Sequence, residues 1–231
     1  MKQYAGIKMF FGFFAIQILF GMISQQGWMG EGLALFLSGI VTMAWAYYLY
    51  KDYLAFAWAD LKGQTTIGKV LALSLGLFFF NALIRVLIIT LLENLIDMDT
   101  LGANQQMLEE IQLNINPLFF IIPTAIAAPF NEEMVFRQAM NGWVFNRPKS
   151  YRWLMAILST LLFAALHVFS PQDFLIYLPL SISMYWIYAR YSYNVWASII
   201  FHFVNNSIAV IAMYAMQFLP QDLQVISNLW K

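Results

Sequence analysis

The chain has 231 residues, of which 61% are hydrophobic and only 10% are charged, whereas an ordinary soluble domain contains about 25% charged residues. This composition predicts a membrane protein. Twelve Lys plus Arg balance twelve Asp plus Glu, and cysteine is absent. The sequence therefore offers no charge excess for binding nucleic acid, no disulfide, no thiolate metal site and no cysteine nucleophile.

Seven apolar stretches are long enough to cross a hydrocarbon core of about 30 Å, which takes about 20 residues at about 1.5 Å each. The first lacks a small-x-small cleavage site, which favours an uncleaved span over a signal peptide. In chain order the expected spans are 4–23, 32–50, 69–92, 117–136, 153–169, 174–189 and 195–219. We expect one all-α, polytopic transmembrane bundle, formed by residues 1–231 as a single domain.

Two further segments lie between the expected spans. Residues 55–61, "AFAWADL", follow the second span and are interpreted as an interfacial piece with Trp58 at the headgroup level. Residues 101–114 carry Glu109 and Glu110 and are typical of an amphipathic surface helix. An eighth span could lie in either segment.

The positions of the charged residues test this arrangement, because cytoplasmic loops are enriched in Lys and Arg. Basic residues fall in alternate connections, and acidic residues occupy the intervening ones. The basic set is Lys2, Lys51, Lys62, Arg147, Lys149, Arg152 and Arg190, and the acidic set is Glu31, Glu93, Asp97, Asp99, Glu109, Glu110 and Asp173. This alternation predicts a multi-pass protein of the cell membrane with its N-terminus in the cytoplasm and its C-terminus outside, and Lys231 is the exception.

A few ionisable groups remain at membrane depth, where each charge costs about 2.5 to 3.5 kcal/mol on insertion scales. They are Arg85, Glu132, Glu133, Arg137, His167 and His202. The stretch "PLFFIIPTAIAAPF" covers only about 21 Å as a helix and must continue through "NEEMVFR" to cross the membrane, which buries Glu132. Pro123 and Pro129 allow this helix to bend, and the carbonyls that they free need partners inside the bundle.

The spacing within "NEEMVFR" separates the roles of its charges. Glu133 and Arg137 are at i and i+4 and can pair, whereas Glu132 points about 100° away around the helix. An unpaired carboxylate in a site of low dielectric constant is suited to proton transfer or to metal binding. The simpler alternative is that all three residues form an inert ion cluster that stabilises the helix.

Two later spans repeat the i, i+4 spacing with histidine. "FAALHVF" places Phe163 and His167 on one helix face, and "FHFVNNS" places His202 and Asn206 on another. Each histidine alone could be a core residue bonded to a carbonyl. Counted from the expected inner ends of their spans, His167 lies about 24 Å deep and His202 about 13 Å deep, so helix ends must shift or tilt to bring the two together.

These motifs resemble the CAAX-processing and bacteriocin-immunity group of intramembrane endopeptidases, also called the Abi or CPBP family. The family pattern is EExxxR, FxxxH and HxxxN, each on its own transmembrane helix, and here it stands as "EEMVFR", "FAALH" and "HFVNN". Trp196 resembles the tryptophan that often precedes the last motif, and Asn194 stands where glycine is common. The resemblance covers the fourth to seventh expected spans.

The resemblance implies cleavage of a peptide bond in a membrane-associated peptide or protein, with residues 117–219 as the catalytic core and 1–92 as accessory spans. Glu132 would activate water, His167 would help to hold that water, and His202 and Asn206 would stabilise the oxyanion. Glu133 and Arg137 would stabilise the helix, with Phe163 as further support. We favour a reaction without a metal; in the alternative, Glu132, His167 and His202 hold zinc and the general base comes from elsewhere.

Several alternatives stay open. Ser198 is at i, i+4 to His202, although a helix serine that bonds its own backbone is favoured over a serine–histidine pair. Arg85 is interpreted as reaching the interface or pairing with Glu93 or another acidic residue, and less readily as docking a substrate carboxylate. At the level of function, the alternatives are a non-catalytic immunity or peptide-binding protein and a small proton-coupled transporter. The sequence identifies neither the substrate nor the oligomeric state.

Overall fold

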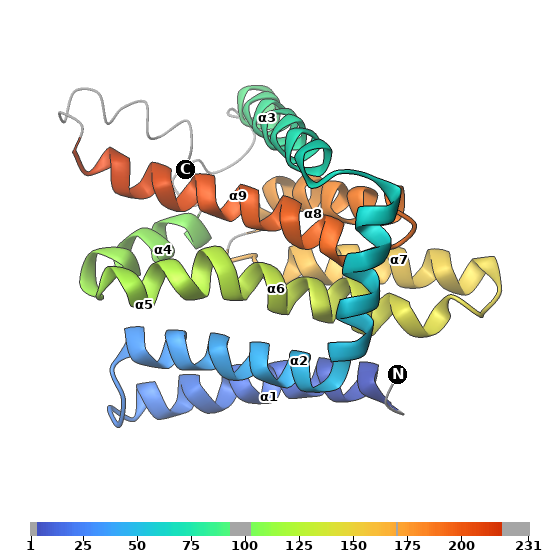
Figure 1. Ribbon diagram of the computed structural model, residues 1–231. Helices are drawn as coiled ribbons and strands as arrows, with labels where there is room; N and C mark the ends of the chain where they lie inside the picture. Colours follow the sequence, from blue (N-terminus) through green and yellow to red (C-terminus); the bar gives the residue numbers. More distant parts are fainter. Residues whose placement is uncertain (1–3, 93–102, 170, 219–231) are drawn as a thin grey trace.

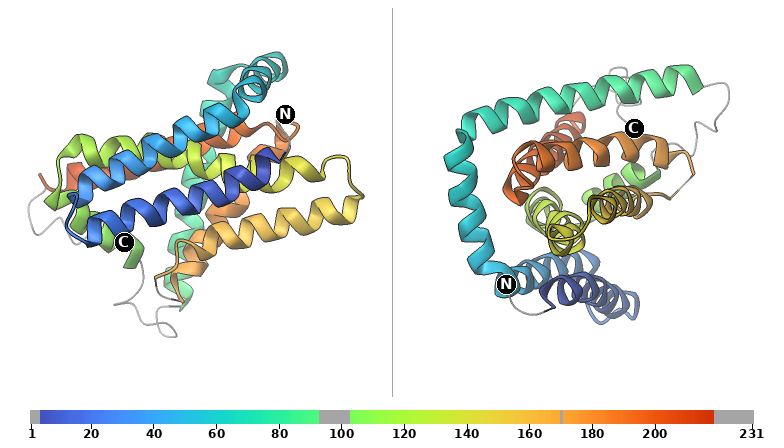
Figure 2. Two further views of the ribbon diagram at one scale, coloured as in Figure 1. Left: turned by 90° about the horizontal axis from the view of Figure 1, so that it is seen from below. Right: turned by 90° about the vertical axis from the view of Figure 1, so that its right-hand side faces the viewer.

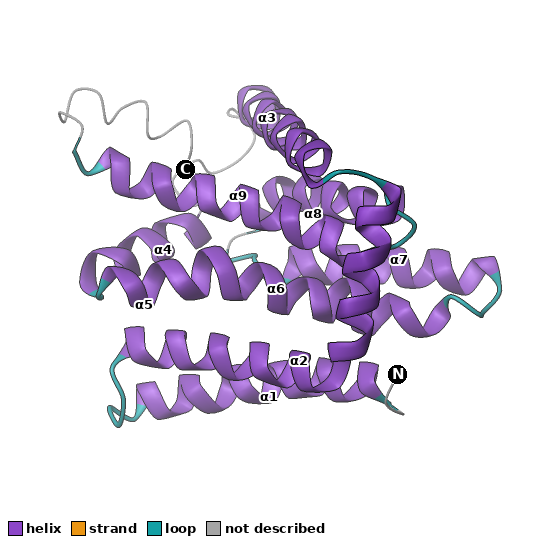
Figure 3. Ribbon diagram, in the orientation of Figure 1, coloured by secondary structure: helices purple, strands orange, loops and turns teal. Residues whose placement is uncertain are grey.

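The computed structural model describes residues 4–92, 103–169 and 171–218, and in these residues all regular structure is helical (Figure 3). The all-α prediction is confirmed. The helices are α1 (Ala5–Gln25), α2 (Glu31–Gln64), α3 (Ile67–Leu92), α4 (Ala103–Asn114), α5 (Pro117–Ile121), α6 (Ala128–Glu133), α7 (Lys149–Ala165), α8 (Asp173–Arg190) and α9 (Val195–Met216). Two π-helical segments, η1 (Ile122–Ala127) and η2 (Met134–Ala139), flank α6, and a short 3₁₀ helix, η3 (Gly142–Val144), follows.

Five of the expected spans are helices long and apolar enough to cross a membrane: α1, α2, α3, α9 and the continuous run Pro117–Val144. The other two expected spans correspond to α7 and α8, with 17 and 18 residues, which do not meet that measure but pack in the same bundle. The chain is an integral membrane protein. Helix α4 has 12 residues and covers only about 18 Å, so it does not supply an eighth span.

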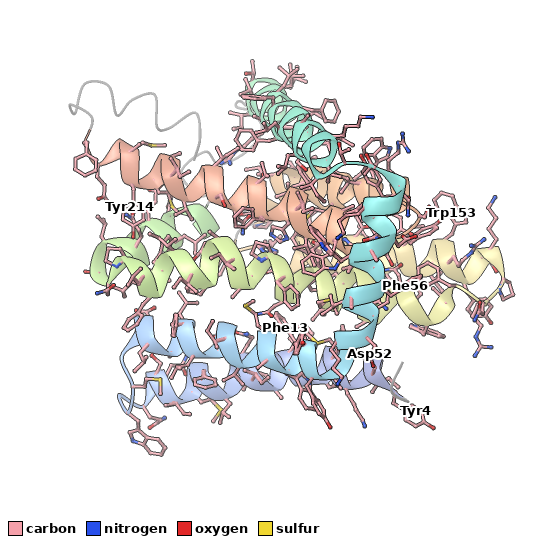
Figure 4. All side chains as sticks on the ribbon, viewed as in Figure 1. Tyr4, Phe13, Asp52, Phe56, Trp153 and Tyr214 are labelled. Atoms are coloured by element: carbon pink, nitrogen blue, oxygen red, sulfur yellow. The ribbon has the colours of Figure 1, made fainter. Side chains whose placement is uncertain are left out.

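Helix α2 corrects the expected end of the second span. We expected that span to stop at residue 50, before a separate interfacial piece, but the 34 residues from Glu31 to Gln64 form one helix. The ribbon changes direction along this helix: Asp52 lies near the turn, and Phe56 lies on the part that runs across the bundle (Figure 4). Residues 55–61 therefore continue α2 in a new direction, because no Pro or Gly interrupts the helix between residues 40 and 62.

The continuous run from α5 to η2 is the central element of the bundle. It contacts α1, α2, α7 and α9 and lies between the α1–α2 pair and α9 (Figure 1). Helices α3 and α8 run across the direction of this central run and contact each other (Figure 2). A side chain on the central run can therefore meet residues from several helices at once.

Small residues bring α2 close to the central run. A Cβ atom on Gly39 would lie 3.0 Å from the Cβ of Ala127, so only glycine fits without displacement. The Asn131 amide donates to the Gly39 carbonyl at 2.9 Å, and Asn131 is buried. This contact fixes α6 against α2 one residue before Glu132.

The start of α9 is tied to the second part of α2. The Asn194 side chain accepts from the N–H of Trp196 and donates to the carbonyl of Ala57 at 2.7 Å. The Trp196 indole donates to the carbonyl of Leu54 at 2.9 Å. Asparagine at position 194 therefore caps α9 and anchors it, which glycine could not do.

Some expectations lie outside the described residues. They concern Lys2, Glu93, Asp97, Asp99, Lys231 and the expected end of the last span at residue 219. The division of the chain into 1–92 and 117–219 stays a prediction.

Candidate active site

Glu132 lies on α6, between the two π-helical segments, and such segments are frequent at functional sites. Its side chain is 16% exposed. The Oε2 atom is buried and has no hydrogen-bond partner among the described residues. An unsatisfied carboxylate oxygen at a partly open position can meet a water molecule or a substrate.

His202, on α9, directs one ring nitrogen toward Glu132 and the other toward Glu133. Its Nδ1 lies 3.2 Å from Oε1 of Glu133, and its Nε2 lies 3.9 Å from Oε2 of Glu132. Because the Glu133 carboxylate pairs with an arginine and can only accept, we assign the Nδ1 proton to this contact. The sequence analysis placed Glu133 with Arg137 and missed its contact with His202.

His167, on the turn after α7, also approaches the Oε2 atom of Glu132. We expected it within a span that ends at residue 169, but α7 ends at Ala165, and His167 lies on the following turn. Its Nδ1 lies 2.8 Å from the Phe163 carbonyl, which can only accept, so Nδ1 carries a proton. Its Nε2 lies 3.7 Å from Oε2 of Glu132.

The exposed fractions of Glu132, His167 and His202 indicate which of them a substrate can reach. His167 and Glu132 are 23% and 16% exposed, whereas His202 is only 3% exposed. A substrate would therefore reach Glu132 and His167 first. His202 forms the inner wall of the site.

Glu133 and Arg137 form the expected pair, with 3.2 Å between the carboxylate and Nε, and both side chains are fully buried. The Arg137 guanidinium also lies over the ring of Phe163, 5.2 Å from its centroid, a cation–π arrangement. The Tyr188 hydroxyl donates to the Arg137 carbonyl at 3.2 Å. Glu133 thus connects a buried cation to the imidazole of His202.

Phe163 holds both histidines by ring contacts. Its ring stacks on His167 with 4.6 Å between centroids and meets His202 edge-on at 5.7 Å. The Tyr177 ring, on α8, stacks on His167 at 5.0 Å, so the imidazole has an aromatic ring on each side. Tyr177 was missed by the sequence analysis, because no motif or spacing relates it to His167.

Asn206 lies one turn beyond His202 on α9, and its amide donates to the Thr124 carbonyl at 3.0 Å. In the register of the π helix, this carbonyl would accept from the N–H of residue 129, which is proline and has none. The expectation that carbonyls freed by proline find partners inside the bundle is confirmed here. Asn205 donates to Oδ1 of Asn206 at 3.2 Å and so fixes the orientation of this amide.

Ser198 and Arg85, the other two polar candidates, lie outside the group formed by Glu132, His167 and His202. Ser198 donates to the Val195 carbonyl at 3.0 Å, as favoured over a serine–histidine pair. Arg85, on α3, lines a cavity together with Glu109. Glu93, the acidic partner that we named for it, lies outside the described residues.

The metal alternative can be compared with this geometry. Both histidines commit Nδ1 to an acceptor and leave Nε2 available, as histidines that bind metals commonly do. Nevertheless, no three His, Asp or Glu side chains of the described residues lie in a group that could hold a metal ion. The zinc set of Glu132, His167 and His202 stays a prediction.

Comparison with known proteins agrees with the motifs. Residues 114–208 match the family of type II CAAX prenyl endopeptidases, Rce1-like. The UPF0177 protein YbdI of Lactococcus lactis subsp. lactis (strain IL1403) is 32% identical over 114 residues, which are 49% of this chain and 60% of that protein. The chain thus matches less than two thirds of that relative's length, and no solved structure matches it. The matched segment contains all three motifs, so residues 114–208 of the chain are similar to the Rce1-like type II CAAX prenyl endopeptidases.

Proposed function

We propose that the chain is an intramembrane endopeptidase, in which Glu132 activates water to cleave a peptide bond of a membrane-associated peptide or protein. One observation carries this proposal. The Nε2 atoms of His167 and His202 lie 3.7 Å and 3.9 Å from the same carboxylate oxygen of Glu132, although the three residues come from different helices or turns. This convergence supports a site that holds one small polar molecule.

The distances suit a water molecule. Both gaps exceed the usual hydrogen-bond range of about 2.7 to 3.2 Å, but a water to the side of either pair can bond both of its atoms at ordinary hydrogen-bond distances. Glu132 removes a proton from this water as its oxygen bonds to the scissile carbonyl carbon, and the carbonyl electrons move to oxygen. When the intermediate collapses, the C–N bond breaks, and the Glu132 carboxyl gives its proton to the leaving nitrogen.

His202 and Asn206 are proposed to stabilise the oxyanion. Asn206 uses one amide hydrogen for Thr124 and has a second for the substrate. His202 would donate from Nε2, while its Nδ1 is directed to the Glu133 carboxylate 3.2 Å away. Such preorganised donors contribute about 3 to 4 kcal/mol each to catalysis.

The proposed reaction requires no metal. If a zinc ion were bound by Glu132, His167 and His202, it would supply Lewis-acid activation of water, and a different residue would have to act as base. Incubation with a strong chelator separates the two cases. Cleavage that survives the chelator supports the metal-free reaction, whereas cleavage that is lost and then restored by zinc contradicts it.

Comparison of Glu132→Gln with the intact chain tests the function. The substitution keeps the size of the side chain and removes its capacity as a base, so cleavage should fall by at least about 100-fold while the protein still folds. The measurement is mass-spectrometric profiling of peptides from cells that carry either form. Glu110→Gln, which changes an exposed carboxyl on α4, is the matched control and should cleave normally.

The alternatives give different results in the same experiment. Capture or protection of a peptide by both the intact chain and Glu132→Gln, without a cleaved product, would indicate a binding protein. Loss of pH-driven flux without any product would indicate a transporter. Either result would contradict the proposed hydrolysis.

We also propose that the chain lies in the cell membrane with its N-terminus in the cytoplasm. The support is the alternation of basic and acidic connections along the sequence. Cysteines introduced singly at Lys62 and Glu31 test it, since both positions are exposed and lie in the last and first turns of α2. A reagent that does not cross membranes should label position 31 in intact cells and position 62 only after lysis.

A further inference from the structure

A cavity of about 430 Å³ lies between α3, α8 and α9. Its lining does not include Glu132, His167 or His202. Its walls are mainly apolar and include Phe78, Ala82, Leu180, Ala209 and Met213. Alanines line it from both α3 and α9, and their short side chains leave the space open. The volume falls within the range of about 300 to 1,000 Å³ that is usual for ligand sites.

The cavity borders the candidate active site through two residues. Tyr177 lines the cavity, and its ring stacks on His167 at 5.0 Å. Asn205 also lines the cavity, and it donates to Asn206 at 3.2 Å. A molecule in this cavity would therefore contact the side chains that orient one candidate histidine and one candidate oxyanion donor.

The lining combines apolar walls with a few polar groups, which include Asn81, Arg85 and Glu109. Asn81 and Ser183 exchange hydrogen bonds of 2.9 Å and 3.2 Å between α3 and α8. A peptide segment presents both kinds of surface, because its side chains can be apolar while its backbone N–H and C=O groups require polar partners.

We propose that the cavity between α3, α8 and α9 is a specificity subsite, which receives a large apolar side chain of the substrate near the scissile bond. The inference rests on the proposed function and deepens it, since it assigns substrate preference to residues outside the three motifs. Tyr177 is the residue shared by the subsite and the catalytic cluster. The subsite selects Leu- or Phe-sized residues over alanine at one fixed position relative to the cleaved bond.

Filling the cavity tests this inference. Ala209→Phe places a large ring in the cavity from α9, and Ala82→Leu enters the same space from α3. Ala215→Phe makes the same change as the first variant at an exposed position of α9 and is the matched control. Each protein, in detergent, is given the same library of proteome-derived peptides, and the residues around each new cleavage site are counted.

The intact chain and Ala215→Phe should prefer a large apolar residue at one position. Ala209→Phe and Ala82→Leu should lower cleavage of those peptides by about tenfold or more, because even a single methylene in an apolar pocket changes discrimination by about 10-fold or more and both variants add a larger group. Peptides with alanine at that position should still be cleaved. Thermal unfolding in the same detergent shows that each variant is folded.

Other outcomes overturn the inference. If both filled variants cleave the library with the preference of the intact chain, the cavity is not a specificity subsite, although the proposed function stands. If they retain that preference but lose a lipid that co-purifies with the intact chain, the cavity binds lipid instead. If the intact chain cleaves nothing that Glu132→Gln leaves uncut, the proposed function fails and the subsite fails with it.

Discussion

Removal of the Glu133 charge should affect stability and catalysis through two different contacts. Glu133 pairs with Arg137 at 3.2 Å, with both side chains fully buried, and also lies 3.2 Å from Nδ1 of His202. Glu133→Gln leaves the guanidinium buried without its counter-charge, which should lower the free energy of unfolding by about 3 to 5 kcal/mol. Loss of the charge-assisted bond to His202, worth about 1.5 to 3 kcal/mol, should lower kcat by about 10- to 150-fold.

A double substitution separates the two effects. Replacement of a buried ion pair by apolar residues is often neutral or stabilising, so Glu133→Leu with Arg137→Met should restore most of the lost stability. Cleavage should stay low, because His202 still lacks its acceptor. The assays are SDS titration in mixed micelles for unfolding and peptide cleavage for kcat, with Glu110→Gln as control.

Two results would refute this reasoning. Recovery of cleavage in the double variant would show that Glu133 serves only the stability of the helix. A loss of less than about 1 kcal/mol in Glu133→Gln, the size of an exposed pair, would show that the pair is not desolvated as the structure describes.

Four further substitutions, at three positions, test the supporting contacts. Asn206→Ala leaves the Thr124 carbonyl without its donor and should lower the free energy of unfolding by about 1 to 3 kcal/mol, measured by SDS titration, together with a loss of cleavage. Tyr177→Phe keeps the ring stacked on the imidazole and should cleave normally, whereas Tyr177→Ala should lower kcat more than it raises KM. Trp196→Phe removes the donor to the Leu54 carbonyl and should cost about 1 kcal/mol, seen as a lower thermal midpoint, with little change in kcat.

Local spacing predicted the parts of the site that depend on a single helix. The pairing of Glu133 with Arg137 follows from i, i+4 geometry. Phe163 and His167 also meet as their spacing predicted, although His167 lies on the turn after α7. The separate direction of Glu132 is likewise a property of its own helix. These relations are fixed by the helical repeat and need no knowledge of the rest of the bundle.

Contacts between helices could not be read in this way. Glu133 and His202 are 69 positions apart, and no pattern in the sequence indicates that they are in contact. Tyr177 and His167 meet because α8 packs against α7. The depth difference of about 11 Å between the two histidines came from counting along straight helices of assumed length. In the structure, α7 ends before His167, and the turn that follows brings the ring to Glu132.

The bend of α2 shows a second limit of sequence reasoning. Residues 55–61 were expected to leave the second span, and their change of direction agrees with that expectation (Figure 4). The helix nevertheless continues, because its backbone can stay hydrogen-bonded while Asn194 and Trp196 hold it against α9. The contacts that fix this part of α2 come from residues about 140 positions later, so no local pattern could have indicated them.

Pro129 of the central run affects how α9, which carries His202, packs beside Glu132. Pro129 removes the N–H that the Thr124 carbonyl would accept in the π register, and Asn206 supplies the replacement from α9. The same exchange holds α9 beside the central run at a point one turn from His202. An unbroken α-helix would satisfy its own carbonyls and leave Asn206 without this partner, so the contact nearest to His202 between α9 and η1 would be lost. The irregular backbone next to Glu132 is therefore part of what brings the carboxylate and the imidazole of α9 together.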